Sequence, residues 1–507
     1  MGGSTGAELV RGPDGALYVR KRGSSPAHLE EECYADALYQ SQGVAVPDFR
    51  LYRDAEGQPA YKLSRFLEGA RSLADVKAAD PGLFASVKAK LSENFYLDAL
   101  LGNWDVVGLS LDNILVTPDG TPYRVDNGGA LRFRAQGAKK AAAAFDGASV
   151  LDFWTMRDAK VNQQAARIFD AIDYDDQLQR ATALYTKTVN LEPGWLGSVK
   201  RDDLTIPSGL YDTLRGRLDE LADTADINDA LRADNVRPAY RAELALEIQH
   251  LRAAGISRRL PAALTPTIGP DGDPNPERVL DLNGDNFDKL RGPTGLVQDF
   301  GAHVARRGGS FDAIQHYTKA QGGSSWSDAA LGVKHWWVNS VVDRGDPEKA
   351  YFWHSSGYGA AARGWDQLKT KFGDEHMRRS LTAYHAMTME TLRQVILPGY
   401  MSNPDGTFDL IRTEADFLPK TYFPTAKVGD TIAPYLRGAM ESTSGFRAIY
   451  AYGSSKHKLV FKNVPAHRVL GTYLINCMNG SSTFLGDNEN EFVADLYGKE
   501  AVWVSSL

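Results

Sequence analysis

Cysteine is scarce in this 507-residue chain, and so are long apolar runs and clusters of positive charge. Cys33 and Cys477 are the only cysteines, too few and too far apart for a disulfide framework or a cysteine zinc site. No apolar run approaches the roughly 20 residues of a membrane-spanning helix, and residues 1–10 lack the basic, then apolar pattern of a secretion signal. The sequence therefore predicts a protein without a membrane span, suited to a reducing compartment.

The charge balance excludes a further class of partner. The net charge is −7 and the Lys and Arg residues are dispersed, so nothing indicates nucleic-acid binding. The hydrophobic content of 43% and the charged content of 24% are typical of globular proteins. Because a chain of this length exceeds one ordinary hydrophobic core, we expect two or three domains.

Three polar residues in the first half have the pattern of a phosphotransfer centre. Asp105 lies in a polar loop, Asn113 precedes the apolar run 114–116, and Asp126 follows the next short strand. The turn sequence 117–120 joins the two strands as a hairpin, so we expect the three side chains at one edge. Phosphoryl transfer needs a carboxylate that orients the attacking group, and an Asn and an Asp that hold magnesium against the phosphates.

A glycine-rich stretch near the N-terminus predicts a phosphate-binding loop. Residues 2–7, GGSTGA, precede a hairpin whose second strand ends at Lys21. Backbone N–H groups of such a loop close on phosphates, and a lysine at the end of the next strand supplies positive charge. We therefore expect Gly3, Ser4 and Lys21 to contact the phosphates.

These residues resemble those of the atypical kinases of the HipA-like and phosphatidylinositol-kinase-like group. The resemblance implies ATP and Mg2+ as cofactors, Asp105 as the catalytic-loop aspartate, and Asn113 and Asp126 as the metal ligands. Protein kinases place four residues between the loop aspartate and asparagine. Seven intervene here, so Asp112 is an alternative for one of these roles.

An acidic helix is expected over residues 28–42, directly after the lysine strand. By the same resemblance, Glu32 on this helix forms an ion pair with Lys21 across the nucleotide cleft, and Glu31 is the alternative partner. Glu68 and the glycine after it are then expected at the hinge beside the adenine.

Apolar spacing and turn residues divide the chain into segments. A helix over 83–101 leads into the loop of Asp105, and helical stripes at 210–221 and 244–251 form a helical hairpin. Five prolines between Pro261 and Pro276 mark the strongest boundary. We predict an α+β protein with a bilobal kinase-like domain at 1–200, a helical spacer at 201–260, a Pro/Gly-rich linker at 261–293, a helical lobe at 294–398 and a strand-rich core at 399–507.

Three short motifs follow one another in the strand-rich part and suit the chemistry of NAD. An arginine fork suits the pyrophosphate, and strand hydroxyls suit the nicotinamide ribose. A carboxylate stabilises the oxocarbenium character that develops when the nicotinamide bond breaks. The motifs are Arg412 on the strand 408–412, Ser442, Thr443 and Ser444 before a further strand, and Glu489 and Glu491 just before the strand 492–494.

This order resembles the mono-ADP-ribosyltransferases of the Arg-Ser-Glu class, among them bacterial toxins that modify actin. The resemblance implies NAD as the cofactor and an ADP-ribosyltransferase fold with a helical lobe and a β core. It implies Glu491 as the catalytic carboxylate and Glu489 as the group that orients the acceptor, and it points to arginine acceptors. Arg437 is an alternative for Arg412.

The two resemblances together imply a fusion of two enzymes. Such a protein is expected to be a bacterial effector or toxin, which modifies a target protein in a host or competitor cell and is exported without a cleaved signal. Two alternatives stay open. The first half is a pseudokinase that regulates the transferase, or it is an active kinase attached to a non-catalytic targeting domain.

Overall fold

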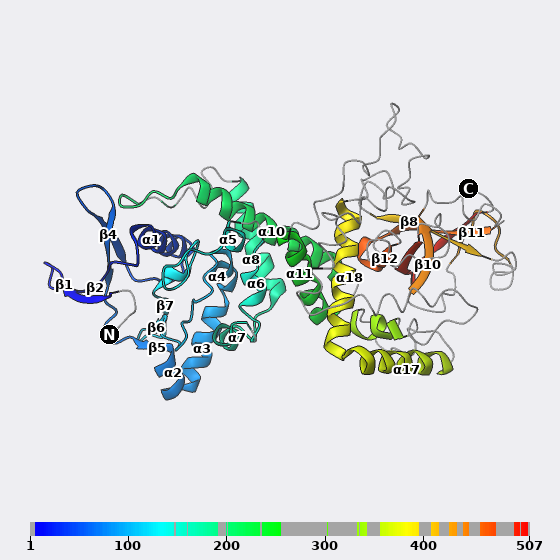
Figure 1. Cartoon of the computed structure of the whole chain (residues 1–507), viewed down its shortest axis with the longest axis horizontal. Helices are drawn as coiled ribbons and strands as arrows, with labels where there is room; N and C mark the ends of the chain where they lie inside the picture. Colours follow the sequence, from blue (N-terminus) through cyan, green and yellow to red (C-terminus); the bar gives the residue numbers. More distant parts are fainter. Residues whose placement is uncertain are drawn as a thin grey trace, which may run out of the picture. The chain divides into compact units, whose positions relative to one another are not determined.

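The computed structural model of the chain divides into two compact units, Met1–Asp229 and Ala230–Leu507. Helices and antiparallel sheets occur in both units (Figure 1), which confirms the predicted α+β class. The structure describes residues 6–146, 149–159, 161–190, 199, 201–233, 236–254, 302, 332–333, 335–341, 355–394, 407–414, 425–432, 440–445, 457–472, 491–496 and 498–504. The predicted linker at 261–293 lies outside these residues and stays a prediction.

An antiparallel four-stranded sheet opens the first unit, with strand order β1-β2-β4-β3. In its register Lys21, at the end of β2, pairs with Lys62 of β4, so the sheet brings two lysines side by side. Gly15 closes the first hairpin with a φ of +79°, a conformation that glycine adopts without strain. The strands are β1 (Glu8–Arg11), β2 (Leu17–Lys21), β3 (Phe49–Arg53) and β4 (Pro59–Arg65).

Helix α1 (Pro26–Ser41) contacts β4 of this sheet and confirms the predicted acidic helix. Its start is fixed by the side chain of Ser25, which accepts a hydrogen bond from the backbone N–H of His28, and by Pro26 in the first turn. Glu32 and Asp36 are four residues apart and therefore lie on one face of the helix, and both are buried. Buried carboxylates require counter-charges, which the two lysines of the sheet supply.

A second, three-stranded sheet contains the predicted hairpin. Its strands are β5 (Arg71–Ser72), β6 (Ile114–Val116) and β7 (Pro122–Arg124), in the order β5-β6-β7. The turn between β6 and β7 closes through the N–H of Gly120, which donates to the carbonyl of Thr117 at 2.9 Å. The hairpin therefore forms as its turn sequence indicates.

Helices fill the rest of the first unit. The helix predicted over 83–101 is two helices, because the helical conformation is interrupted between Ser92 and Phe95. The helical stripe predicted at 210–221 belongs to a longer helix that continues to Ala233. The helices are α2 (Leu73–Ala79), α3 (Pro81–Ser92), α4 (Phe95–Leu100), the 3-10 helix η1 (Asn127–Gly129), α5 (Ala142–Phe145), α6 (Asp152–Thr155), α7 (Gln163–Ile168), α8 (Tyr174–Asn190) and α10 (Ser208–Ala233).

A buried arginine and a part-buried lysine fix the point where α4 ends and the loop of Asp105 begins. Arg217 of α10 donates to the carbonyls of Ala99 and Leu100 at 3.1 and 2.9 Å, which satisfies the C-terminal end of α4. Lys140 donates to the carbonyl of Gly102 at 2.6 Å. The start of the loop is therefore held by side chains from two later segments.

The second unit contains an antiparallel sheet of seven described strands, in the order β12-β13-β10-β8-β11-β14-β9. Helices described in this unit are α11 (Pro238–Ala253), the π-helix η6 (Trp337–Val341), α17 (Ser355–Phe372), α18 (Asp374–Gln394) and the 3-10 helix η8 (Ala466–Arg468). The strands are β8 (Phe408–Glu414), β9 (Thr431–Ile432), β10 (Met440–Gly445), β11 (His457–Val464), β12 (Val469–Thr472), β13 (Glu491–Asp495) and β14 (Ala501–Val504).

Helix α18 packs against β12 and against α11. Thr388 on α18 donates to the carbonyl of Leu470 at 2.9 Å, and the ring of His385 contacts the carbonyl of His467 at 3.0 Å. Apolar side chains such as Phe408 and Phe461 form a buried cluster on the sheet. The described strands of the second unit therefore have a hydrophobic core of their own.

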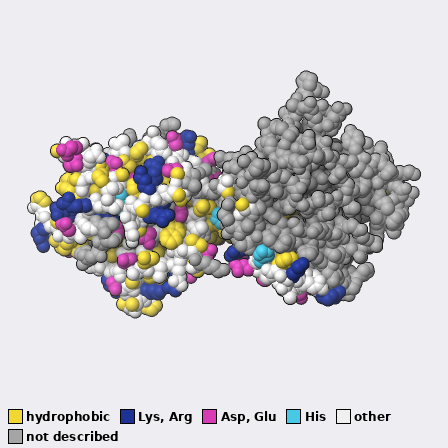
Figure 2. All heavy atoms as spheres, viewed as in Figure 1, with side chains coloured by type: hydrophobic (Ala, Val, Ile, Leu, Met, Phe, Trp, Pro, Cys, Tyr) yellow, Lys and Arg dark blue, Asp and Glu magenta, His cyan; other side chains and the backbone are white. Residues whose placement is uncertain are grey.

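Charged side chains of both signs are interspersed on the face of the first unit that Figure 2 shows. None of the helices in the described part of the chain combines the length and the apolar character that crossing a bilayer requires.

Candidate functional site

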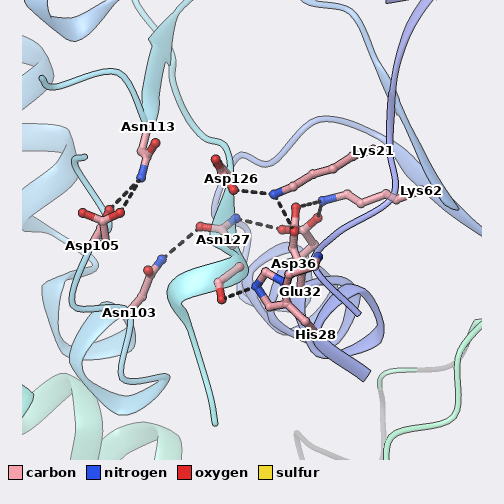
Figure 3. Close-up of polar contacts among 12 residues, drawn as sticks. Lys21, His28, Glu32, Asp36, Lys62, Asn103, Asp105, Asn113, Asp126 and Asn127 are labelled. Carbon is pink, nitrogen blue, oxygen red and sulfur yellow. Dashed lines mark hydrogen bonds and ion pairs between the residues drawn. The ribbon is translucent and has the colours of Figure 1, made fainter. Parts of the chain in front are cut away.

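The centre of the candidate site is an ion pair between the strand lysine and the helix glutamate. The Nζ of Lys21 lies 2.7 Å from Oε2 of Glu32 and also pairs with Oδ1 of Asp126 (Figure 3). The side chain of Glu32 is 1% exposed and that of Lys21 is 9% exposed, whereas that of Asp126 is 42% exposed. The lysine thus joins a buried carboxylate to one that faces solvent.

Electrostatics keep this pair charged despite its burial. Burial opposes the charge of Lys21, but the carboxylates of Glu32 and Asp126 outweigh it and raise the pKa of the lysine. Burial likewise opposes ionisation of Glu32, and here the two lysines Lys21 and Lys62 outweigh it and lower the pKa of the glutamate. The alternative partner, Glu31, instead accepts from the backbone N–H of Arg132 at 2.9 Å. The structure therefore pairs Lys21 with Glu32.

Asp126 has an unusual backbone conformation, with φ 55° and ψ 51°. This left-handed region is uncommon for residues other than glycine, although Asp tolerates it better than most. The residues after Asp126 form η1 and pack closely on α1. A Cβ added at Gly128 would lie 2.7 Å from Nε2 of His28, and that nitrogen contacts the carbonyl of Gly128 at 2.9 Å. The close approach of η1 to α1 therefore requires glycine at this position.

Asp105 and Asn113 lie together despite the long loop between them. Nδ2 of Asn113 donates to the backbone carbonyl of Asp105 at 2.8 Å and lies 3.4 Å from its Oδ2. The intervening residues fold back in successive turns, which include a bond from the N–H of Gly108 to the carbonyl of Asp105 at 2.9 Å. Gly108 and Leu111 both have positive φ, 72° and 58°. Asp112, the alternative, is exposed.

The carboxyl of Asp105 is a weaker acid than an ordinary aspartate. Partial burial is the largest cause, and the negative charges of Asp126 and Asp112 add to it. Together they outweigh the hydrogen bond from Asn113 and raise the pKa of Asp105 to about 6. A carboxylate with a pKa near neutrality can accept a proton from a hydroxyl group as the reaction proceeds.

A buried polar network that the sequence analysis missed connects these groups. Lys62 lies 2.9 Å from Oε1 of Glu32 and also pairs with Asp36. Nδ2 of Asn127 donates to Asp36 at 2.8 Å, and Nδ2 of Asn103 donates to Oδ1 of Asn127 at 3.0 Å. Figure 3 shows these side chains between the two lysines and the loop of Asp105.

Available sequence signals for this network were weak. The spacing of four residues between Glu32 and Asp36 indicates a shared helix face, but α1 carries several other acidic residues. Lys62 has no motif around it, and only the strand register sets it beside Lys21. Long-range register of this kind is not readable from local sequence.

A cavity of about 430 Å³ lies beside the segment that links the two sheets of the first unit. The predicted hinge residue Glu68 is part of its wall, which also includes apolar side chains from β2 and from the segment before β3. Its lining residues are Ala16, Leu17, Val46, Pro47, Asp48, Arg65, Phe66, Leu67, Glu68, Thr117 and Tyr123.

The motifs of the second unit lie on neighbouring strands. In the register, Ser444 of β10 pairs with Glu491 of β13 on one side and with Ile411 of β8 on the other. Arg412 follows Ile411 in β8, and alternate residues of a strand belong to opposite faces of the sheet, so the register assigns Arg412 to the face opposite that of Ser444. Ser442, two residues before Ser444 in β10, shares the face of Ser444. Thr443 pairs with Phe492. The predicted residues Gly3, Ser4, Glu489 and Arg437 lie outside the described residues.

Comparisons with known proteins give little direct guidance. No protein-family model matches the chain, and no curated protein matches it. Among solved structures, the chain is similar to the crystal structure of a Helicobacter pylori proinflammatory kinase, CtkA, at 16% sequence identity and a TM-score of 0.27. The match covers 45% of this chain and 92% of that chain. At this distance we draw no conclusion about function from it.

Proposed function

We propose that the first unit is a phosphotransferase that uses ATP with Mg2+ and acts on a protein hydroxyl group. The observation that carries this proposal is the buried pair of Lys21 and Glu32, with Asp126 on the same lysine nitrogen. Phosphoryl transfer requires little covalent help from the protein, and its needs are positioning and positive charge beside the phosphates. A lysine held between a buried and a solvent-facing carboxylate provides both.

Oxygen ligands for magnesium are available at the exposed side of the pair. Asp126 offers a carboxylate, and both contacts of Asn113 with Asp105 use its Nδ2, so they leave the amide oxygen of Asn113 unengaged. Carboxylate and amide oxygens suit Mg2+, so the residues present fit the ion. When bound, magnesium would neutralise negative charge on the transferred phosphate.

Each remaining group then has a defined task. Lys21 contacts the phosphates, and we propose that Gly3 and Ser4 contact them as well. Glu32 holds the ammonium group of Lys21 in position through their ion pair. Asp105, with its raised pKa, orients the attacking hydroxyl and takes up its proton. The cavity lined by Leu17, Val46 and Glu68 supports a place for the base of the nucleotide, because its volume is within the range of small-molecule sites.

The test is transfer of radiolabel from γ-labelled ATP to a mixed protein substrate by the full chain with Mg2+. We expect Asp126→Asn to reduce transfer at least about 100-fold, since it removes an anionic metal ligand. Asp119→Asn is the matched control, because Asp119 is an exposed aspartate in the turn of the same hairpin. Transfer by the Asp126 variant at the wild-type rate would overturn the proposal. Nucleotide binding without any transfer by the wild-type chain would select the regulatory pseudokinase instead.

For the second unit we propose an NAD-dependent mono-ADP-ribosyltransferase. The supporting observation is the register that sets Glu491 of β13 directly opposite Ser444 of β10 on adjacent strands. The reaction places an arginine, strand hydroxyls and a carboxylate around one NAD molecule, so motifs far apart in sequence must meet on adjacent strands. Glu489 would orient the acceptor, which we propose to be an arginine of a target protein in a host or competitor cell.

Release of nicotinamide from NAD tests this second proposal. We expect Glu491→Ala to reduce release at least about 100-fold, since the developing positive charge loses its carboxylate. Glu500→Ala changes an exposed glutamate of the same unit and should leave the rate unchanged. Intact NAD after long incubation of the wild-type chain with a host-cell lysate would overturn the proposal. Mass spectrometry of that lysate identifies arginine residues that gain ADP-ribose.

A further inference from the structure

Two buried lysines share one buried glutamate in the first unit, although phosphate binding requires only one of them. Lys21 and Lys62 lie 2.7 and 2.9 Å from the two oxygens of Glu32. Lys62 is 5% exposed, so it is well shielded from solvent. Burying a second ammonium group destabilises the folded state unless an opposite charge lies beside it. The presence of Lys62 in the core therefore requires an explanation.

The second partner of Lys62 supplies that reason. Lys62 pairs with Asp36, which lies one turn beyond Glu32 on α1 and is 0% exposed. The other oxygen of Asp36 accepts a hydrogen bond from Asn127 at 2.8 Å, and Asn127 directly follows Asp126 in the chain. Lys62 therefore neutralises the carboxylate of Asp36. The other partner of that carboxylate is Asn127, in the loop that carries the proposed metal ligand Asp126.

Asn127 is also bonded on its other side. Its Oδ1 accepts from Asn103 at 3.0 Å, two residues before Asp105, and Asn127 and Asn103 are each 1% exposed. A continuous line of side-chain contacts thus joins helix α1 to the residues that follow Asp126 and that precede Asp105. These connecting side chains are too deeply buried to contact a nucleotide. They can therefore influence nucleotide or metal binding only through the position of other residues.

Asp126 needs such support because of its backbone. Its left-handed conformation is held only where neighbouring contacts fix it, and the side chain of the next residue is bonded at both ends. A relaxed backbone at Asp126 would move its carboxylate away from Lys21 and change its position relative to Asn113, the other proposed metal ligand.

We propose that Asp36 and Asn127, with Lys62 as the counter-charge of Asp36, are positioning residues that set Asp126 for metal binding. This inference rests on the proposed phosphotransferase function. Because Lys62 also contacts Glu32, the position of the metal ligand Asp126 depends on the position of helix α1. The loss of the Asp36–Asn127 bond should weaken binding of the metal far more than binding of the nucleotide.

The experiment compares the Mg2+ concentration that gives half-maximal phosphotransfer with the Kd of ATP measured without metal. Asn127→Ala in the full chain should raise the half-saturating Mg2+ concentration about tenfold or more, and it should change the metal-free Kd of ATP less than about threefold. Saturating Mg2+ should restore most of the rate, because no group that touches substrate is lost. A merely structural role would instead lower the active fraction and leave the half-saturating concentration unchanged.

A second variant covers the case in which Asn127→Ala does not fold. The double variant Asp36→Leu with Lys62→Met removes the buried charges as a pair, which buried ion pairs often tolerate. It should shift the half-saturating Mg2+ concentration in the same direction. Gln177→Leu is the matched control, because buried Gln177 accepts one hydrogen bond from the N–H of Tyr96 at 3.0 Å. It should lower the melting temperature without changing the response to Mg2+.

The outcomes separate the two proposals. An active wild-type chain whose folded variants keep the wild-type response to Mg2+ overturns the positioning role and leaves the phosphotransferase intact. A wild-type chain that transfers no phosphate overturns both. Direct binding of Mn2+ with ATP, measured by its paramagnetic signal, gives the same comparison without turnover and should weaken about tenfold in either variant.

Discussion

The carboxyl of Asp105 is under opposing demands. In its proposed role it must be ionised to accept a proton, yet partial burial and the charges of Asp126 and Asp112 favour its neutral form. This conflict is typical of a residue whose position is set by chemistry and not by stability. It leads to two measurable consequences for a single side chain.

The first consequence is a pH dependence of phosphotransfer. With a pKa of about 6, Asp105 is protonated in more of the molecules as the pH falls, so kcat/KM for the free enzyme should decline with unit slope below about pH 6. The measurement is initial rates between pH 5 and 8 with Mg2+ in excess, so that the nucleotide is fully complexed. A flat profile across this range would show that Asp105 does not act as the base.

The second consequence concerns stability. The folded-state pKa of about 6 exceeds the ordinary value of 3.8, so the folded state binds the proton more tightly and stability is lost as the pH rises from about 4 to 6. Asp105→Asn removes the cost of ionising this carboxyl in the folded state, so it should raise the melting temperature by a few degrees at pH 8. At pH 4 the gain should largely vanish. A variant less stable than wild type at pH 8 would contradict the raised pKa.

At the scale of single elements, α1 connects the sheet to the loop that carries Asp126. It presents Glu32 to both lysines, Asp36 to Lys62 and to Asn127, and His28 to the carbonyl of Gly128. These contacts make α1 the element whose position determines whether the site is assembled. Two neighbouring glutamates on this helix offer a direct test.

Glu32→Gln and Glu31→Gln should differ sharply in stability. Glu32→Gln removes one of the two carboxylate partners of each buried lysine, Lys21 and Lys62, which should cost about 3–5 kcal/mol. Glu31 pairs with the part-exposed Arg132, so Glu31→Gln should cost less than about 1 kcal/mol. Calorimetry of the full chain resolves this, with the transition of the first unit identified by its upward shift with ATP and Mg2+. Equal losses would contradict the buried pairing.

Much of this arrangement could be predicted from sequence, and the exceptions have physical reasons. Turn chemistry at 117–120 was enough to predict the hairpin, and the acidic helix expected over residues 28–42 corresponds to α1. Gly128 was not singled out, since its need arises from the approach of His28, which is 100 residues away in the chain. Contacts of that range depend on packing, which local patterns do not encode.

The fold of the loop between Asp105 and Asn113 also could not be predicted from the sequence. The loop's unusual length leaves Asp112 as an alternative for one of the predicted catalytic or metal-binding roles, because residue spacing does not reveal how a loop folds. Successive turns at Gly108 and Leu111 bring Asn113 back to Asp105 and leave Asp112 exposed. The pairing of Lys21 with Glu32, by contrast, followed from a resemblance in sequence order and agrees with the geometry.

At the scale of the whole molecule, the chain has two compact units with separate sheets. The described residues of the proposed phosphotransfer site all lie in the first unit, and Arg412, Ser442 and Glu491 of the second proposed site all lie in the second. No residue of one proposed site is shared with the other. The two proposed activities should therefore respond independently to substitution.

A crossed comparison tests this independence. Asp126→Asn should abolish phosphotransfer and leave release of nicotinamide from NAD within about twofold of wild type, and Glu491→Ala should do the reverse. Both assays use the full chain, with calorimetry as a check on folding. If loss of one activity removes the other in a folded variant, then one unit controls its partner, and the regulatory alternative replaces the fusion of two independent enzymes.

The most direct measurement of the phosphotransfer site is the position of a bound metal. Crystals of the full chain grown with Mn2+ and a non-hydrolysable ATP analogue would locate the ion by its anomalous scattering. We expect one strong peak within coordination distance of Asp126 and Asn113, with phosphate oxygens beside Lys21. A nucleotide bound elsewhere, or a metal peak that contacts neither Asp126 nor Asn113, would contradict the proposed site.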